Sequence, residues 1–401
     1  MTGSDSVAQD RIAARLARLS IGVFFIGGFL TAIVGLLVPR VVLTLGLDYA
    51  RALLIQLAFY SSYLLFAAPI AVAILRIGYM RGIAAGLLTM AAACALLVVA
   101  IGSGSFGLTL AALLLLSAGV TFLQIACNTV FTLVGSPGRA AARLTLLQGF
   151  NALGTVIGPS IGAWFLLGRD QGQAAAPFVA ATALLLVLGA LFVRHRDLLP
   201  PMARGADRAP LRSAMPGLLR DRRLMAGTIA IFAYVGAEVT IGTLLANFLM
   251  LPDVIAADPV SAGRMVGLYW AGAMIGRFAG AGVLRRVHPP LALFATAAGG
   301  IVLTVAAALL DGWPAAAALI AVGLCNAIMY PTIYALALPQ DEATAPLASM
   351  LLCMAVVGGA IVPLLTGIVA DAAGLAPAML MPSACYVVVA GFALSCLREK
   401  K

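Results

Sequence analysis

The chain has 401 residues, of which 63% are hydrophobic and only 10% are charged. A soluble domain is about half apolar and about a quarter charged, so this composition excludes an ordinary soluble protein and predicts a polytopic, all-α membrane protein. The net charge of +10 would suggest a nucleic-acid ligand in a soluble chain, but its distribution points to membrane topology, and we expect no nucleic-acid partner.

Apolar runs long enough to cross a bilayer as helices, roughly 20 residues each, recur along the chain between short polar breaks. The predicted spans are 18–45, 50–75, 82–102, 106–133, 143–168, 175–194, 224–251, 260–284, 290–310, 314–338, 346–371 and 376–397. The only long polar break runs from Arg194 to Arg223. We therefore predict twelve transmembrane helices in two six-helix bundles, 1–194 and 224–401, joined by a basic cytoplasmic linker at 195–223.

Positive charge is unevenly distributed over the polar breaks. If both termini are cytoplasmic, the inner face holds 21 Lys and Arg residues, and the outer face holds only Arg40, Arg51, Arg169 and Arg264. An excess of Lys and Arg marks the cytoplasmic side, so we predict cytoplasmic termini. Arginine outnumbers lysine 23 to 2, which is typical of a GC-rich bacterial genome and favours a bacterial inner membrane.

The two halves carry similar segments at similar spacing. Asn128 and Asn326 each follow a cysteine and are 198 residues apart, and Pro159 and Pro363 are 204 apart. The basic loops after the second and eighth runs give an offset of 209. Three similar offsets in the same order indicate two related bundles, an organisation in which the ligand site lies near the midplane between repeats.

Seven stretches carry a family pattern over most of the chain. They read ALLIQLAFYSSYL, FLQIACNTVFTLVGSP, ARLTLLQGFNALGTVIGPSIG, FAYVGAEVTIGTLLANFL, GRFAGAGVLRRV, CNAIMYPTIYALAL and GGAIVPLLTGIVADAAG. Together they resemble the fucose/galactose/glucose sugar symporters of the major facilitator superfamily, and the glutamate of YVGAEV is similar to the glucose/galactose branch. The resemblance implies the major facilitator fold, alternating access, a hexose such as glucose or galactose as substrate, and a monomer surrounded by membrane lipid.

Two acidic positions of this family are absent. Aligned on Pro39, the Asn-Asp pair of the family's first helix is replaced by Val34 and Gly35, and the glutamate of the fucose branch in helix 4 is Gln124. The resemblance implies proton coupling and sugar binding for these acids, so the symport mechanism does not carry over intact. Proton or sodium symport, an uncoupled sugar facilitator, a permease for a less polar molecule and a binding sensor all stay open.

Glu238 is the only acidic residue deep inside a predicted span. The nearest charged residues in the sequence, Arg223 and Asp253, are each fifteen positions away, which on a helix places the carboxyl near the bilayer midplane. Ionisable residues at that depth generally serve function. We predict that Glu238 binds substrate and is the coupling residue, with an interhelical hydrogen bond as the structural alternative.

Amides and tyrosines form short polar stripes in other spans. Neighbours three or four positions apart share a helix face, as Gln124 and Asn128 do, and side chains that both donate and accept suit a polyhydroxylated ligand. Interhelical bonding is the structural alternative. The predicted substrate-binding residues are Gln124, Asn128, Gln148, Asn151, Glu238, Asn247, Asn326 and Tyr330. Asn247 can face the same cavity as Glu238 only if the helix breaks, for which Gly242 is the candidate.

Arg143 and Arg277 are predicted at cytoplasmic helix ends, where they could lock an inner gate by ion pairing or simply anchor topology. The six cysteines are scattered singly, a pattern that does not favour a metal or disulfide site, and both histidines fall in arginine-rich loops. The chain shows neither a nucleophile with a base nor a phosphate-binding loop. We therefore expect no cofactor, no metal and no enzymatic activity.

Overall fold

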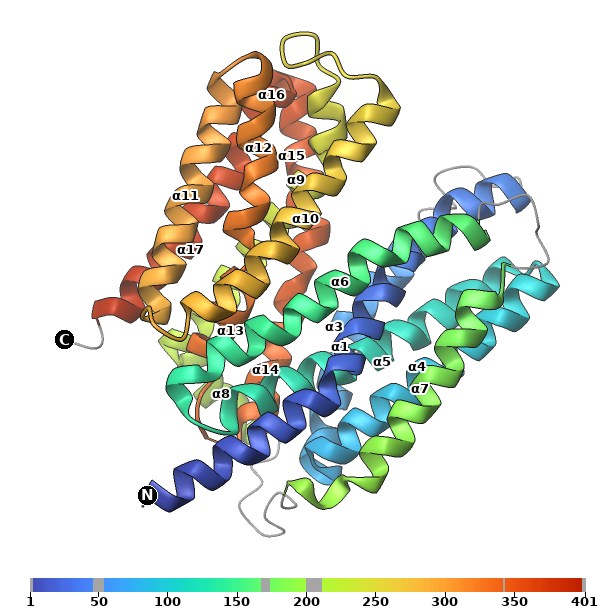
Figure 1. Cartoon of the computed structure of the whole chain (residues 1–401), viewed down its shortest axis with the longest axis vertical. Coiled ribbons are helices and arrows are strands. Elements are labelled where there is room, and N and C mark those ends of the chain that lie inside the picture. Colours follow the sequence, from blue (N-terminus) through green and yellow to red (C-terminus); the bar gives the residue numbers. More distant parts are fainter. Residues whose placement is uncertain (1–2, 46–53, 167–173, 200–210, 342, 399–401) are drawn as a thin grey trace. The chain divides into compact units, whose positions relative to one another are not determined.

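The structure, a computed structural model, describes residues 3–45, 54–166, 174–199, 211–341 and 343–398. Within these ranges the chain folds into helices and contains no strand (Figure 1). Nine of the described helices are long and apolar enough to cross a membrane. Each of the twelve predicted spans coincides, where it is described, with one helix or with successive helices, as a twelve-helix fold requires.

One compact unit comprises Met1–Ser136, Phe150–Met215 and Pro339–Met354. Its helices are α1 (Gly3–Leu45), α3 (Leu54–Ile77), α4 (Tyr79–Ser103), α5 (Phe106–Leu133), most of α6 (Ala140–Leu166), α7 (Ala176–Arg194) and α14 (Ala345–Met354). The α4 helix packs against α5 and α7, while α3 and α14 pack against each other and against α5. The Ser349 hydroxyl of α14 donates to the Ile125 carbonyl of α5 at 3.3 Å, so a small polar side chain ties these two helices.

Glycine allows α1 and α6 to cross with their backbones in contact. A Cβ atom at Gly154 would collide with the carbonyl oxygen of Phe25, and one at Gly28 with the carbonyl oxygen of Asn151. Small residues at helix crossings let membrane helices approach closely and gain van der Waals contact. The glycine spacing in α6 is therefore explained by packing on α1.

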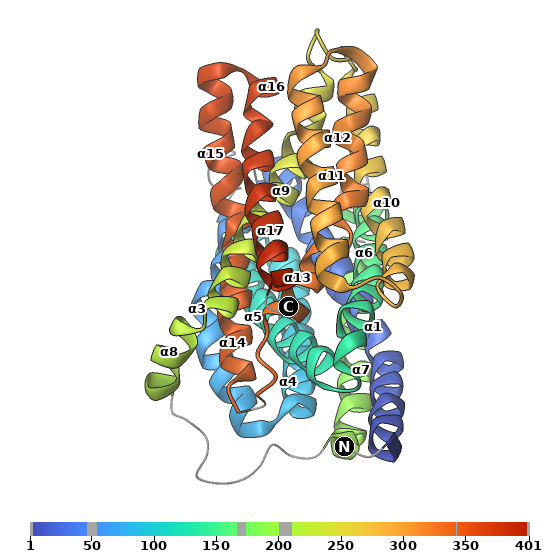
Figure 2. The ribbon, with the colours of Figure 1, turned by 90° about the vertical axis from the view of Figure 1, so that its left-hand side faces the viewer.

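A second unit comprises Pro137–Gly149, Pro216–Leu338 and Ala355–Lys401. It contains the start of α6, α9 (Arg222–Leu249), α10 (Pro259–Val283), α11 (Pro289–Leu309), α12 (Gly312–Asn326), α13 (Met329–Ala337), α15 (Gly358–Ala373), α16 (Leu375–Ala378) and α17 (Leu380–Arg398). The α9 helix packs against α10, α13, α15 and α17. Both views show α11 beside α12 (Figures 1 and 2). The predicted division at 194 and 224 stays a prediction, because these compact units also include segments from the opposite half of the sequence.

The α9 and α15 helices repeat the glycine crossing of α1 and α6. A Cβ at Gly358 would collide with the carbonyl oxygen of Phe232. Gly154 and Gly358 are 204 positions apart, the offset that also separates Pro159 from Pro363. The same backbone contact therefore occurs at equivalent places in the two halves, which supports the internal repeat.

Three predicted spans are discontinuous: 376–397 divides near its start into α16 and α17, and the other two break near their middle. The span 314–338 divides into α12 and α13 at Ala327 and Ile328. Pro331 explains this break, since a proline has no N–H for the carbonyl four residues earlier and its ring crowds that carbonyl. The span 346–371 is interrupted by a 3₁₀ turn at Ala355–Val357. Gly358 and Gly359 follow directly, and only proline has a lower helix propensity than glycine.

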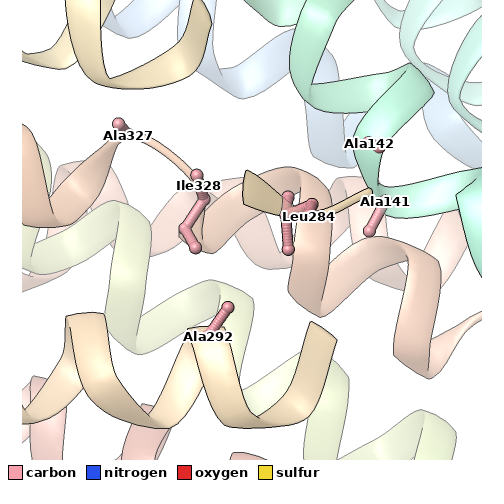
Figure 3. Close-up of a cluster of buried hydrophobic side chains, with 6 residues drawn as sticks. All are labelled: Ala141, Ala142, Leu284, Ala292, Ala327 and Ile328. Carbon is pink, nitrogen blue, oxygen red and sulfur yellow. The ribbon is translucent and has the colours of Figure 1, made fainter. Parts of the chain in front are cut away.

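Small apolar side chains surround the break between α12 and α13. The cluster consists of Ala141, Ala142, Leu284, Ala292, Ala327 and Ile328, all buried (Figure 3). It joins the first turn of α6 to the end of α10, to α11 and to the break itself. The break is therefore enclosed by packing and belongs to the interior of the second unit.

The predicted linker 195–223 contains a helix that we did not predict, α8 (Leu211–Arg220). Ala214 and Leu218, one turn apart, are buried, so one face of α8 packs on the protein. The next helix, α9, begins at Arg222, and the Asp221 carboxylate caps it by accepting from the backbone N–H groups of Arg223 and Leu224. Asp221 is of the residue type that favours this capping position.

Candidate functional site

Glu238 forms an ion pair inside the second unit. Its Oε1 atom lies 3.3 Å from Nη2 of Arg277, which is on the neighbouring helix α10. The side chains of Arg277 and Glu238 are only 12% and 14% exposed. The prediction that Arg277 marks a helix end is corrected, because α10 continues to Val283. Glu238 therefore has a counter-ion on another helix. The sequence did not reveal it, because the nearest charged residues along the chain are fifteen positions away.

Two tyrosine hydroxyls lie beside the ion pair. Tyr269 of α10 donates to the backbone carbonyl of Glu238 at 3.1 Å. Tyr234, one turn before Glu238 on α9, donates to the backbone carbonyl of Asn326 at 3.1 Å and also interacts with the Glu238 side chain. Both tyrosines are fully buried. Arg277 thus bonds the carboxylate to α10, Tyr269 bonds the Glu238 backbone to α10, and Tyr234 ties the same turn of α9 to α12.

Asn326 joins three tyrosines at one residue. Its Nδ2 donates to the Tyr269 hydroxyl at 2.8 Å, and its Oδ1 accepts from Tyr386 of α17 at 2.7 Å. Asn326 is the last residue of α12, and the last carbonyls of a helix have no partner within it. The Tyr234 hydroxyl meets that need at the Asn326 carbonyl. The break before α13 therefore makes Asn326 available for contacts from α9, α10 and α17.

Tyr330 and Tyr334 extend this network as aromatic surface. The Tyr330 ring centroid lies 6.4 Å from that of Tyr234 and 6.0 Å from that of Tyr334. Tyr330 was predicted from its stripe on the tenth span. Tyr234, Tyr269 and Tyr386 were not among the predicted site residues, although Tyr234 precedes Glu238 by four positions and so shares its helix face.

The first turns of α6 lie along α10 in the same unit. A Cβ at Gly149 would fall 3.0 Å from the Phe278 ring, and Thr145 lies against Gly280. Gln148, predicted to bind substrate, is buried next to this contact and is 7% exposed. Gln148 lies between Thr145 and Gly149, the two residues that contact α10, which is the helix that carries Arg277. Arg143, one turn from the start of α6 and predicted to gate, is half-buried.

The predicted polar residues of the first unit bond to each other or to helix backbone. Asn128 donates from Nδ2 to Oε1 of Gln124 at 2.7 Å, which confirms that the two side chains share a face of α5. Asn151 donates to the Phe24 carbonyl of α1 at 3.1 Å and so contributes to the crossing of α1 with α6. Val34 is buried in α1.

The predicted helix break at Gly242 is wrong. The α9 helix is continuous from Arg222 to Leu249, and a Cβ at Gly242 would fall 2.6 Å from the Trp270 indole. The glycine therefore makes room for Trp270 of α10. On a continuous helix of 3.6 residues per turn, a separation of nine residues places two side chains on opposite faces. Asn247 is exposed and does not join Glu238.

In the described ranges, no group of three or more His, Cys, Asp or Glu side chains comes together that could bind a metal ion. The cysteines are free thiols. The chemistry of the Glu238 network is instead that of hydrogen bonding, because it combines a guanidinium, a carboxylate, an amide and tyrosine hydroxyls. Such a set can hold a polar, uncharged molecule with many hydroxyl groups.

Known proteins resemble the whole of this chain. Residues 19–339 match the family model described as Major Facilitator Superfamily. The glucose/galactose transporter of Brucella abortus biovar 1 (strain 9-941) is 37% identical, with 98% of this chain and 96% of that protein aligned. The L-fucose-proton symporter of Escherichia coli (strain K12) is 27% identical over 92% of this chain and 90% of its own length. The crystal structure of the major facilitator transporter FucP in the outward conformation superposes with a TM-score of 0.87 at 25% identity, covering 96% of this chain and 99% of that one.

Proposed function

The chain belongs to the Major Facilitator Superfamily, as a multi-pass membrane transporter and not an enzyme, and on that premise we propose that it moves a hexose such as glucose or galactose by alternating access. The relatives that match nearly the full length of the chain are named for sugars. Their names supply the substrate class, and the chemistry of the polar network is consistent with it.

The observation that carries the proposal is the polar network around Glu238. A hexose presents several hydroxyl groups, each of which can donate and accept a hydrogen bond. Arg277 supplies donors, Glu238 supplies acceptors, and Asn326 with its tyrosines supplies both. The clustered rings of Tyr234, Tyr330 and Tyr334 add apolar surface of the kind that ligand pockets combine with a few placed polar groups.

The other predicted residues support the proposal to different degrees. Gln148 approaches α10 in the same unit as Glu238, and we assign it a sugar contact. Gln124 and Asn128 form one bonded pair on α5, and we keep that pair as a proposed sugar contact. Asn151 is occupied with the α1 backbone and Asn247 lies away from Glu238, so neither supports the proposal further.

A second candidate function is an uncoupled sugar facilitator. Two observations favour it. Gly35 stands where the family resemblance implies a coupling acid, and Glu238, the acid that remains in the membrane, already has Arg277 as counter-ion. A proton would have to compete with this pair for the carboxylate. Coupling to protons therefore requires that the pair open during the transport cycle.

The proposal includes a setting in the cell. We assign the protein to a bacterial inner membrane, with both termini in the cytoplasm and with one chain as the working unit. Without Arg277, which lies inside α10, the distribution of positive residues is 20 to 4, and it supports the orientation. The relatives named above come from bacteria.

Uptake into proteoliposomes tests the proposal. Labelled glucose and galactose would be supplied with no gradient, with an imposed pH gradient and with an imposed sodium gradient. Accumulation driven by one gradient would identify a symporter and its ion, and equilibration without accumulation would identify the facilitator. If neither sugar enters faster than into protein-free liposomes, the hexose proposal is wrong.

A further inference from the structure

The Glu238–Arg277 pair is loose and singly bonded. One guanidinium nitrogen meets one carboxylate oxygen at 3.3 Å, whereas charge-assisted N–H···O bonds are about 2.7–2.9 Å and Arg–carboxylate pairs are often bidentate. The Nε atom of Arg277 is buried and has no hydrogen-bond partner in the described part of the chain. Arg277 therefore keeps an unused donor, although the two charges are nearly removed from solvent.

Such a pair is a poor way to stabilise a membrane helix bundle. Removing two charges from water costs several kcal/mol per ion, and Coulomb attraction offsets this only with good geometry and satisfied hydrogen bonds. A closed, bidentate pair would meet that condition, but the observed geometry does not. Ionisable groups inside membrane segments instead mark substrate and ion pathways, which points to a ligand that completes the hydrogen bonding.

We propose that Glu238 and Arg277 form a charge-neutral clamp that accepts two neighbouring hydroxyl groups of an uncharged sugar and rejects sugars that carry a carboxylate or an ammonium group. This inference rests on the proposed sugar transport. In the clamp, an N–H group of Arg277 donates to one hydroxyl oxygen, and the other hydroxyl donates to a carboxylate oxygen of Glu238. The 12% and 14% exposure of the two side chains leaves each within reach of a small ligand.

Rejection of charged sugars follows from the balance of the two charges. A carboxylate on the sugar would be attracted by Arg277 but repelled by Glu238. An ammonium group would be attracted by Glu238 but repelled by Arg277. Neither charged group therefore gains a net electrostatic attraction in the site, and each loses its hydrating water. A like-charge contact in such an environment costs several kcal/mol, so the clamp discriminates through an unfavourable contact as well as through favourable ones.

Removing one charge should therefore redirect specificity in a predictable sense. Glu238→Gln leaves Arg277 without a counter-ion, so the site becomes positive and should accept hexuronates such as glucuronate. Arg277→Gln leaves Glu238, so the site becomes negative and should accept protonated glucosamine. The double variant is neutral again. A merely structural pair predicts loss of stability in both single variants and no opposite change in ligand preference.

Competition against labelled glucose on the purified, full-length protein tests the clamp. Glucuronate and glucosamine would be titrated at a pH where the amine is protonated. Relative to glucose, Glu238→Gln should bind glucuronate on the order of tenfold better than the parent, which corresponds to about 1.4 kcal/mol, and Arg277→Gln should show this gain for glucosamine only. The double variant should reject both, as the parent does. Arg264→Gln removes an exposed charge from the same helix and should leave selectivity unchanged.

The charge-retaining variants Glu238→Asp and Arg277→Lys should keep the parent's rejection of charged sugars even where glucose affinity falls, so they test the clamp if the neutral variants do not fold. Unchanged preferences in folded single variants, or equal competition by charged sugars in the parent, would overturn the clamp. Failure of the parent to bind any neutral hexose would instead overturn the proposed sugar transport.

Discussion

At the scale of single residues, Asn326 determines how the buried tyrosines are held. It donates to Tyr269, accepts from Tyr386 and offers its backbone carbonyl to Tyr234. Because all four residues are buried, water cannot replace a lost partner. The network therefore acts as a unit, and the cost of changing one member depends on which partners remain.

Asn326→Ala should destabilise the protein by about 1–3 kcal/mol, because the Tyr386 hydroxyl loses its acceptor while Tyr269 keeps its bond to the Glu238 carbonyl. Its measurement is the shift of thermal unfolding of the purified protein. Combining it with Tyr386→Phe removes the stranded hydroxyl, so the double variant should lose less stability than the sum of the two single changes. Additive losses would show that Tyr386 and Asn326 act independently.

Glu238→Gln separates sugar movement from ion coupling. If Glu238 carries the coupling proton, the variant should still exchange external labelled sugar for internal sugar but should no longer accumulate it under a pH gradient. The amide can donate and accept hydrogen bonds but has no proton to transfer at these pH values. Counterflow and gradient-driven uptake in the same proteoliposomes give the two readouts. Equal accumulation by variant and parent would assign the residue a structural role.

At the scale of elements, glycines and prolines explain how the helices cross and where they stop. Backbone contact between α1 and α6 requires Gly154, and α9 and α15 repeat this contact at Gly358. Pro331 leaves the Ala327 carbonyl without an N–H partner, at the break that directly follows Asn326. These positions control the site without touching a ligand, because they set how closely the helices that carry its side chains approach one another.

Gly154→Ala should destabilise the protein by about 1–3 kcal/mol, since its Cβ would overlap the Phe25 backbone and overpacking carries costs of that size. Gly391→Ala is the matched control on α17, where a Cβ meets no atom within 4 Å. It should be neutral or stabilising, because alanine favours helix over glycine by about 1 kcal/mol. Similar unfolding temperatures for the two variants would contradict the close crossing.

Pro331→Ala should weaken sugar transport without unfolding the protein. Alanine restores an N–H for the Ala327 carbonyl, which lets α12 and α13 join and changes the turn that holds Asn326 against Tyr234. We expect slower hexose uptake together with an unchanged or higher unfolding temperature. Lower stability with normal uptake would show that the break does not serve the site.

At the scale of the whole molecule, charge and repeat describe the same topology. The positive residues concentrate in alternate loops, and the glycine contacts at Gly154 and Gly358 recur at the offset that separates Pro159 from Pro363. Both features are expected of a chain built from two related bundles. Orientation in the membrane is the part of this description that an experiment can test directly.

Cytoplasmic termini predict the behaviour of reporter fusions at the C-terminus. A fused green fluorescent protein, which folds in the bacterial cytoplasm, should fluoresce, and a fused alkaline phosphatase, which needs the periplasm, should be inactive. A fusion placed after Arg264 should show the opposite pattern, because that residue is predicted on the outer face. An active phosphatase at the C-terminus would show that the C-terminus is periplasmic and that the predicted orientation is wrong.

The number of spans, the family and the presence of an acid within the membrane follow from the sequence alone, because hydropathy and charge are local properties of each segment. Even the break after Asn326 has a local cause in Pro331. Only the tertiary structure decided that Arg277 is the partner of Glu238, 39 residues away, and that tyrosines 57, 60 and 92 positions from Asn326 converge on it. Such contacts depend on which helix faces pack together, and spacing along one helix carries no record of its neighbours.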